Sequence, residues 1–349
     1  MLKTPAYAAN SAKAPLVPFS IERRELRAHD VLIDILYCGI CHSDVHQISD
    51  DWGRGIFPMV PGHEIVGRIT RVGDQVSKWN AGDTVGIGCF VDSCRECAAC
   101  KDGEEQFCEQ GATFTYNSKE RDGVTLTYGG YSTRIVVAQD YVLQIPDGIP
   151  LERAAPLLCA GITTYSPLRH YGVRVGSRTA VVGLGGLGHM AVKLAHAMGA
   201  HVTVLSHSPG KRQDALQLGA DDFIATRDAE VFTQHAKRFD FILDTVSAQH
   251  DYNAYLGLLR RGGTMVLVGL PEPSLLSASP LIMGRRQLAG SLIGGIRETQ
   301  EMLDFCAAHH VASDVEVIPI QQINAAYERL VRGDVRYRFV IDIATLKRS

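Results

Sequence analysis

The sequence predicts an α/β protein in which a doubly wound parallel sheet is joined to a β-rich, barrel-like domain. The chain has 349 residues, a length that suggests two domains. Short apolar strands dominate residues 1–151, whereas strands and helices alternate over residues 152–293. Hydrophobic residues make up 46% of the chain and charged residues 21%, so a packed core is expected rather than disorder.

The first region carries three segments with the composition of short strands. They are rich in Val and Ile and are bounded by turn residues; they span residues 31–36, 65–72 and 131–137. This pattern predicts the β-rich domain over residues 1–151.

The second region, residues 152–293, alternates buried strands with helices that end at glycine. Helices are predicted over residues 188–198 and 211–218, and strands over residues 179–182, 202–205, 223–224, 239–243 and 264–268. Such alternation implies a parallel sheet built from right-handed crossovers.

The tail, residues 294–349, returns to a mixed pattern. It contains a predicted helix over residues 299–308 and a predicted strand over residues 338–341. We expect the tail to rejoin the first region, so that residues 1–151 and 294–349 form one domain.

Charge and hydropathy argue against several classes of partner. The formal net charge is only -3, which implies no strongly basic face for nucleic acid. No stretch reaches the ~18 continuous apolar residues that a membrane span needs. Residues 1–19 lack the basic start and apolar run of a signal peptide. We therefore expect a cytoplasmic protein that binds neither nucleic acid nor membrane.

A glycine-rich motif lies between the strand at residues 179–182 and the helix that follows. Its residues, Gly183, Leu184, Gly185, Gly186, Leu187 and Gly188, match G-x-G-x-x-G. In this context the glycines permit a tight turn, close approach to a pyrophosphate and close packing of helix on strand. The helix N-terminus would then bind phosphates. A glycine-rich turn without a ligand is the alternative, but the strand and helix around it favour a dinucleotide-binding Rossmann domain.

The end of the next strand lacks the acidic residue by which NAD enzymes of this fold bind the ribose 2′-hydroxyl. Small hydroxyls and cations stand there instead: Ser206, Ser208, Lys211 and Arg212. These groups suit a 2′-phosphate. An ordinary solvated loop is the alternative, and the missing acid favours NADP(H).

Four of the nine cysteines lie within fifteen residues, at Cys94, Cys97, Cys100 and Cys108. In a cytosolic enzyme, clustered cysteines more often hold metal than form disulfides. Four thiolates at this loop spacing suit a closed, tetrahedral structural zinc. An iron–sulfur cluster is the alternative, but no other feature indicates electron transfer. We expect a structural zinc lobe over about residues 89–112.

A second group of potential metal ligands is dispersed along the chain. Cys41 follows an apolar strand, His63 precedes the strand at residues 65–72, and Cys159 lies in an apolar segment. Two thiolates and one imidazole would form a catalytic zinc site with its fourth position open. Each of these residues taken singly is weak evidence for a metal site, because Cys159 resembles a buried small hydrophobe and His63 resembles a structural histidine.

Together these residues resemble the zinc-dependent medium-chain alcohol dehydrogenases. The closer likeness is to the cinnamyl-alcohol-dehydrogenase-like branch, which includes bacterial broad-range NADPH-dependent aldehyde reductases. It covers nearly the whole chain and rests on residues 38–44, 61–64, 94–108, 158–163, 183–188 and 337–341. The likeness implies that the β-rich domain is a GroES-like catalytic domain.

The resemblance also implies roles for residues around the dispersed cluster. Cys41, His63 and Cys159 match the catalytic zinc ligands, and Glu64 matches an adjacent acid that exchanges with the metal's water. Asp44 matches the carboxylate that orients the histidine ligand, a function that metal sites of this kind require.

Further matches concern the cofactor and a proton relay. Thr163 matches a residue beside the nicotinamide, and Arg338 matches one that reaches the pyrophosphate, although a helix-lining hydroxyl and an exposed strand arginine are the alternatives. Ser43 and His46 match a relay from the zinc-bound substrate oxygen to solvent, for which a histidine suits proton transfer near neutral pH. Asp51 matches a further acid of some relatives, and an exposed loop aspartate is an equal alternative.

The resemblance therefore implies an enzyme that reduces aldehydes to primary alcohols, reversibly, with NADPH and two zinc ions per chain. A homodimer is expected, paired through the edge of the nucleotide sheet near residues 291–294. The alternatives are a carbon–carbon double-bond reductase of the same superfamily and a non-enzymatic regulator that binds zinc and nucleotide. The complete cysteine and histidine set and the relay residues argue against both.

Overall fold

A computed structural model describes residues 1–348 of the chain, which divide into two compact units. The first unit comprises Met1–Cys159 and the chain from Gly294 onward, and the second comprises Ala160–Ile293. The first boundary thus lies after Cys159 rather than after residue 151. The reason is that α3 (Leu151–Ala154) and the following turn, Ala155–Leu158, pack on strands of the first unit.

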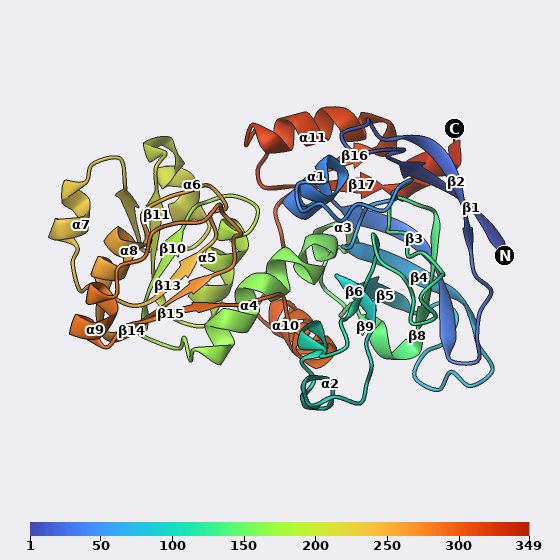
Figure 1. Cartoon of the computed structure of the whole chain (residues 1–349), viewed down its shortest axis with the longest axis horizontal. Coiled ribbons are helices and arrows are strands. Elements are labelled where there is room, and N and C mark those ends of the chain that lie inside the picture. Colours follow the sequence, from blue (N-terminus) through green and yellow to red (C-terminus); the bar gives the residue numbers. More distant parts are fainter. Residues whose placement is uncertain (349) are drawn as a thin grey trace. The chain divides into compact units, whose positions relative to one another are not determined.

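The first unit is built on a seven-stranded sheet (Figure 1). Along the sheet lie β16 (Val315–Pro319), β17 (Arg338–Asp342), β3 (Asp30–Gly39), β4 (Ile65–Val72), β5 (Thr84–Ile87) and β9 (Leu143–Gln144), with β8 (Arg134–Ala138) paired to β3. The tail enters this sheet, since β17 pairs antiparallel with β3. The predicted strand at residues 65–72 is confirmed with the same bounds.

The strand predicted at residues 131–137 begins only at Arg134. The three preceding residues are part of a loop whose backbone bonds elsewhere. The N–H groups of Gly129 and Tyr131 donate to the carbonyls of Val60 and Pro61, at 2.7 and 3.0 Å. This loop therefore lies against the segment that carries His63.

Smaller elements complete the first unit. Two antiparallel pairs are formed by β1 (Leu2–Ala8) with β2 (Val17–Arg23) and by β6 (Phe90–Asp92) with β7 (Thr113–Phe114). Besides α3, the helices are α1 (His42–Ser49), α2 (Ala98–Asp102), α10 (Ile296–Ala308) and α11 (Ile323–Val331). The predicted helix at residues 299–308 thus begins three residues earlier, at Ile296.

The second unit confirms the predicted parallel sheet. Its six strands lie in the order β12 (Asp222–Ala225), β11 (His201–Ser206), β10 (Arg178–Val182), β13 (Phe239–Asp244), β14 (Leu259–Leu267) and β15 (Gln287–Gly290), and every pair is parallel. The order reverses direction between β10 and β13, which is where such folds bind ligands.

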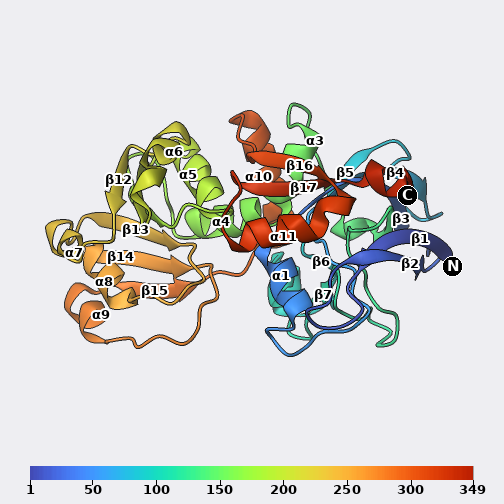
Figure 2. The same cartoon turned by 90° about the horizontal axis from the view of Figure 1, so that it is seen from above.

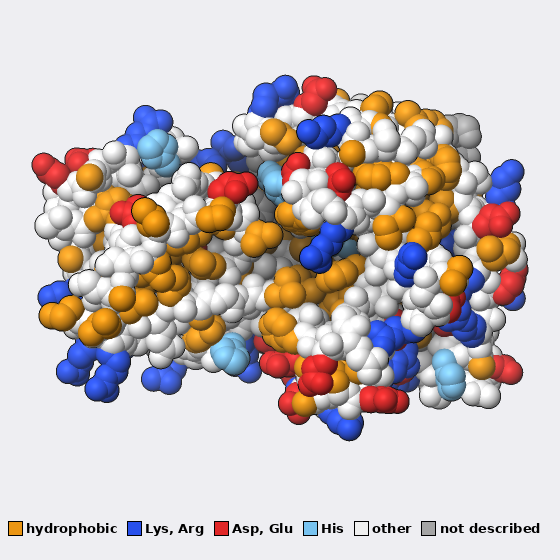
Figure 3. All heavy atoms as spheres, in the orientation of Figure 1, with side chains coloured by type: hydrophobic (Ala, Val, Ile, Leu, Met, Phe, Trp, Pro, Cys, Tyr) orange, Lys and Arg blue, Asp and Glu red, His pale blue; other side chains and the backbone are white. Residues whose placement is uncertain are grey.

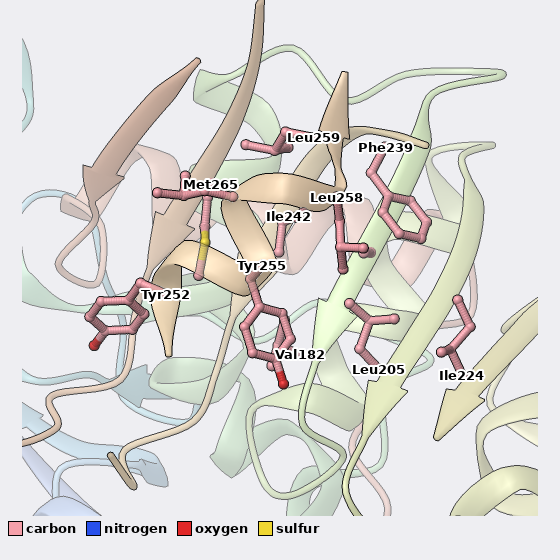
Figure 4. Packing of buried hydrophobic residues seen from close by; sticks show 12 residues of the cluster. Val182, Leu205, Ile224, Phe239, Ile242, Tyr252, Tyr255, Leu258, Leu259 and Met265 are labelled. Carbon is pink, nitrogen blue, oxygen red and sulfur yellow. The ribbon is translucent and has the colours of Figure 1, made fainter. Parts of the chain in front are cut away.

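Helices lie on both faces of this sheet, with α5 on one and α8 on the other (Figures 1 and 2). The helices are α4 (Ala160–His170), α5 (Gly188–Ala197), α6 (Arg212–Gln217), α7 (Glu230–Gln234), α8 (Tyr252–Leu258) and α9 (Ser279–Gly284). The helix predicted from residue 211 begins as a 3-10 turn at Pro209–Lys211. The side chains of α8 pack into an apolar core against β10, β11, β13 and β14 (Figure 4).

The surface carries both signs of charge. In the face shown in Figure 3, blue and red side chains are interspersed rather than gathered into one large area. Among the described residues, no helix combines the length and apolarity that crossing a bilayer demands.

Candidate zinc and dinucleotide sites

The first candidate site begins at the N-terminus of α1. Cys41 is the N-cap residue of this helix, and its backbone N–H donates to Asp44 Oδ2 at 2.8 Å. Bonding between the N-cap residue and the third helical residue forms a capping box here, which fixes the first turn of the helix. The local sequence thereby holds the thiol of Cys41 and the carboxylate of Asp44 in defined places.

Four buried side chains meet beside this turn. Cys41 follows β3, His63 and Glu64 precede β4, and Cys159 follows the turn after α3. One potential ligand atom from each of the four lies within 4.8 Å of the others, and the two thiol sulfurs are 3.9 Å apart. That distance is far from the ~2 Å of a disulfide, and two sulfurs, a nitrogen and an oxygen make a donor set that suits zinc.

The carboxylate of Asp44 contacts His63, one of the four residues of this cluster. It is completely buried, and His63 Nδ1 lies 3.2 Å from its Oδ1, so Nε2 is the imidazole nitrogen left for a metal. Gly62 N–H also donates to Oδ1 at 3.2 Å, and Tyr131 Oη donates to Oδ2 at 3.3 Å. Carboxylates of this kind orient the histidine ligand of zinc sites. The geometry accords with the role expected for Asp44, which stays a prediction.

The two carboxylate oxygens of Glu64 differ in their contacts. Its Oε1 forms a buried ion pair with Arg338. Among the residues that the structure describes, Oε2 has no hydrogen-bond partner although it is buried. A buried orphan acceptor is costly unless something binds it. One carboxylate oxygen of Glu64 lies within 4.8 Å of ligand atoms from two thiols and an imidazole, so a divalent cation fits the site.

Arg338 is only 2% exposed, which excludes the alternative of an exposed strand arginine. Its partner Glu64 was not predicted from the sequence, because 274 residues separate the two. A contact between Arg338 and the cofactor pyrophosphate stays a prediction.

The proton affinities in this cluster are strongly perturbed. The hydrogen bond from Cys159 holds the pKa of Cys41 well below its usual range, against the effect of burial. Burial lowers the pKa of His63, but the negative charge of Asp44 outweighs it, and the pKa is raised well above its ordinary value. Burial raises the pKa of Glu64 to about 7, although Arg338 opposes the shift. Perturbed groups of this kind gather at functional sites.

The second candidate site is the four-cysteine lobe. Ligand atoms of Cys94, Cys97, Cys100 and Cys108 all lie within 4.8 Å of one another. Two backbone N–H groups donate to sulfurs at 3.3 Å, from Cys94 to Cys108 Sγ and from Cys97 to Cys94 Sγ. Bonds of this kind favour the thiolate form. The predicted set is thus brought together as a closed, all-sulfur group that suits a structural zinc.

The lobe is fastened to the start of α10. Ile296 N–H donates to Glu105 Oε2 at 3.0 Å, and Arg297 Nη2 donates to the carbonyl of Asp102 at 2.6 Å. Glu105 therefore caps the helix N-terminus, where a carboxylate is favoured by the helix dipole. Folding of the lobe and ordering of the returning chain are coupled through these two contacts.

In the second unit the glycine motif forms the predicted turn. Gly183 has a φ of 88°, and a Cβ on Gly188 would clash with the carbonyl oxygen of Gly183. A Cβ on Gly185 would meet nothing within 4 Å, so the turn is open at that point. A turn that is tight at its ends and open at its middle is what a pyrophosphate needs.

The expected 2′-phosphate residues gather only partly around this turn. Ser206, the last residue of β11, accepts a hydrogen bond from Ser208 N–H at 3.2 Å. Lys211 Nζ donates to the carbonyl of Leu184 at 2.8 Å, so its ammonium lies at the glycine turn. Arg212 instead donates to the carbonyl of Phe223 at 3.1 Å. A role for any of them in phosphate binding stays a prediction.

The relay residues lie on α1. Ser43 Oγ is 3.7 Å from Cys41 Sγ, beside the candidate metal cluster. His46 is half-buried, stacks on Trp52, and its Nδ1 lies 2.8 Å from Asp51 Oδ2. The structure therefore places Ser43 next to the buried cluster and His46 nearer the solvent.

Other site residues have positions that sequence reasoning did not anticipate or could not test. Thr163 is buried on α4 in the second unit. Tyr327, on α11, donates to Tyr131 Oη at 3.1 Å and so extends the Asp44 network. Cys89 donates to the carbonyl of Leu158 at 3.8 Å. Hydrogen bonds with Cys41 and then with Cys89 raise the pKa of Cys159 well above its usual range. These contacts join distant segments, and no local motif indicates them.

A sulfur-rich metal cluster and a dinucleotide turn are what a metal-dependent dehydrogenase needs, and comparison with known proteins agrees with that class. Residues 27–147 match the alcohol dehydrogenase GroES-like domain, and residues 186–308 match the zinc-binding dehydrogenases. The chain belongs to the zinc-dependent medium-chain alcohol dehydrogenases, in their cinnamyl-alcohol-dehydrogenase-like branch.

Three similar proteins illustrate this membership. NADP-dependent alcohol dehydrogenase C 1 of Mycolicibacterium smegmatis is 58% identical, with 98% of each chain covered. Aldehyde reductase YahK of Escherichia coli is 55% identical, with 99% of each chain covered. The crystal structure of a CAD from Helicobacter pylori complexed with NADP(H) is 44% identical, covers 98% of this chain and 99% of that one, and has a TM-score of 0.92.

Proposed function

We propose that this chain reduces aldehydes to primary alcohols, reversibly, with hydride from NADPH, over a broad range that includes aromatic and cinnamyl-type aldehydes. The observation that carries the proposal is the buried cluster of Cys41, His63, Glu64 and Cys159. The relatives of this chain support the proposed chemistry, since they include an aldehyde reductase and an NADP-dependent alcohol dehydrogenase.

Zinc would be held by Cys41, His63 and Cys159, with Glu64 adjacent, and when bound it supplies Lewis-acid polarisation of a carbonyl oxygen. Asp44 orients His63 through the contact at Nδ1. Ser43 Oγ, beside the cluster, gives a proton to the substrate oxygen as the alcohol forms. His46, which lies nearer the solvent, would resupply the proton that Ser43 gives up.

The second unit would bind the cofactor at the turn between β10 and α5. The N-terminus of α5, which carries the positive end of the helix dipole, suits the pyrophosphate. Ser206 and Ser208 offer hydroxyls, and Lys211 offers a charge, to the 2′-phosphate. Thr163 and Arg338 are proposed to contact the nicotinamide and the pyrophosphate, respectively.

Replacing Ser206 with aspartate is expected to weaken NADPH binding by roughly tenfold or more, because a carboxylate would repel the 2′-phosphate. NADH binding should improve, since the new acid can accept from the ribose 2′-hydroxyl. Dissociation constants for both cofactors, measured by nucleotide fluorescence, check this. Ser206→Asn is the neutral control and should change the preference little. An unchanged preference in Ser206→Asp would place the phosphate site elsewhere.

A substrate panel tests the proposed activity itself. Purified enzyme is supplied with NADPH or NADH and with aromatic, aliphatic and α,β-unsaturated aldehydes, while zinc is counted in the same sample. We expect NADPH oxidation, the corresponding alcohol as product, and two zinc ions per chain. Saturation of the carbon–carbon double bond would identify the double-bond reductase instead. Zinc and NADPH binding without turnover would indicate the non-enzymatic regulator.

We further propose that two copies pair through the edge of the parallel sheet. Among the described strands β15 ends the order of the parallel sheet and pairs with β14, and edges of this kind are normally protected. Large apolar side chains are exposed close by in the sequence, with Ile282 at 76% and Met283 at 83%. The molar mass in solution, measured by light scattering, should be twice that of the 38.0 kDa chain.

A further inference from the structure

A buried carboxylate that the proposed mechanism does not use lies at the carboxyl end of a strand of the parallel sheet. Asp244 is the last residue of β13 and is 1% exposed. Both of its oxygens are occupied. Oδ1 accepts from Val246 N–H at 3.1 Å, and Oδ2 lies 2.7 Å from His250 Nε2. Asp244 and His250 thus close a short loop, residues 245–249, into a ring.

The histidine of this ring faces an acceptor on each side. His250 Nδ1 lies 2.8 Å from the carbonyl oxygen of Ala248, while Nε2 faces Asp244. A neutral imidazole carries one N–H and can satisfy only one of these acceptors, whereas an imidazolium satisfies both. The contacts therefore favour the protonated form.

The surroundings of His250 act in the same direction. Burial lowers the pKa of His250, but the hydrogen bonds to Asp244 and Ala248 and the charges of Asp244 and Asp251 raise it above its ordinary value. The rings of Tyr252 and Tyr255, on α8, contact the imidazole edge-on at 4.9 and 5.3 Å between centroids.

The loop that this pair closes lies directly on the glycine turn. Thr245 donates twice to the carbonyl of Val182, from its N–H at 3.1 Å and from its Oγ1 at 2.7 Å. A Cβ on Gly183 would lie 2.8 Å from Val246 Cγ2. The loop and the turn are therefore in close contact, and a shift of one displaces the other.

We infer that protonated His250, held by Asp244, is a positioning residue for the dinucleotide, and that cofactor binding weakens when His250 loses its proton. The inference rests on the proposed cofactor function and adds a residue outside the motif. Loss of the proton leaves one acceptor unsatisfied and removes the charge that holds Asp244. The loop then loosens against Gly183, where the pyrophosphate is expected.

The pH profile of NADPH affinity tests this. Dissociation constants are measured by nucleotide fluorescence from pH 6 to 9 in the wild type, His250→Gln and Asp244→Asn. The 2′-phosphate itself titrates near pH 6, so the differences between the profiles are the readout. His201→Gln is the matched control. His201 is exposed at the start of β11, which is the end of the parallel sheet opposite to the glycine turn.

We expect His250→Gln to bind NADPH about tenfold more weakly than the wild type at pH 6 and to approach it as pH rises. Asp244→Asn should move the wild-type loss of affinity to lower pH, because the charge that retains the proton is gone. A merely structural contact would lower affinity equally at every pH. Profiles of both variants parallel to the wild type would overturn the inference.

Hydrogen exchange separates this inference from the cofactor proposal. With no cofactor present, residues 245–250 should exchange faster in His250→Gln than in the wild type or in His201→Gln. Unchanged exchange together with unchanged NADPH affinity would refute the positioning role and leave the cofactor proposal standing. A wild type that binds no NADPH at any pH would refute the cofactor proposal itself, and with it the inference.

Discussion

Cys159→Ala is expected to abolish aldehyde reduction, with kcat/KM lowered by more than about 100-fold, since even partners that only support a metal ligand contribute 10–100-fold. Cys159 Sγ lies 3.9 Å from Cys41 Sγ inside the buried cluster. Its removal takes one of two sulfur donors from the proposed zinc site and leaves Cys41, His63 and Glu64 buried around an incomplete set. We expect the bound zinc to fall from two ions to one per chain.

The control for this prediction is a cysteine of similar burial that lies in neither cluster. Cys306 is completely buried on α10, with Met302 Sδ 3.6 Å from its sulfur. Cys306→Ala should keep both zinc ions and most of the activity, at a small cost in stability from the lost packing. Kinetics with one aromatic aldehyde, zinc analysis and thermal melting are measured on both variants. A zinc-depleted Cys159→Ala enzyme with full turnover would rule out the proposed metal-dependent mechanism.

The candidate sites differ in how far the sequence alone could predict them. The cysteines of the lobe lie close in the chain, so their spacing predicts a common ligand set without knowledge of the fold. The glycine motif is equally local, because strand, turn and helix follow one another. Cys41, His63 and Cys159 are far apart in the chain. Their residue types suggested a zinc site, but no spacing supported that grouping, and the resemblance to a known family made it specific.

The sequence alone could not predict contacts that form only when distant segments pack together. An exposed strand arginine was the alternative to a pyrophosphate contact for Arg338, yet the residue is buried against Glu64 because β17 pairs with β3 beside the cluster. Tyr131 sits in a segment predicted as strand, but its loop turns the hydroxyl onto Asp44. His250 follows a strand end without any motif. In each case the partner is set by tertiary packing, which local periodicity does not encode.

Cys94→Ser is expected to damage stability rather than the chemistry. Structural zinc sites contribute directly to folding free energy, so loss of this ion should lower the melting temperature by roughly 10 °C. The lobe holds Glu105 against the first turn of α10, and its unfolding would release that cap. Hydrogen exchange in residues 295–300 should therefore rise, while the catalytic zinc and the activity of the remaining folded enzyme persist.

Cys306→Ser is the matched control, because it makes the same thiol-to-hydroxyl change at a buried site that holds no metal. It should lower the melting temperature less than Cys94→Ser does and should retain two zinc ions. The metal analysis also separates the two interpretations of the lobe, since an iron–sulfur cluster would appear as iron with visible absorption in the wild type. A Cys94→Ser protein that keeps both zinc ions and melts as the wild type does would show that Cys94 does not hold a stabilising zinc. The contacts of Glu105 with Ile296 and of Asp102 with Arg297 would then have to order the lobe by themselves.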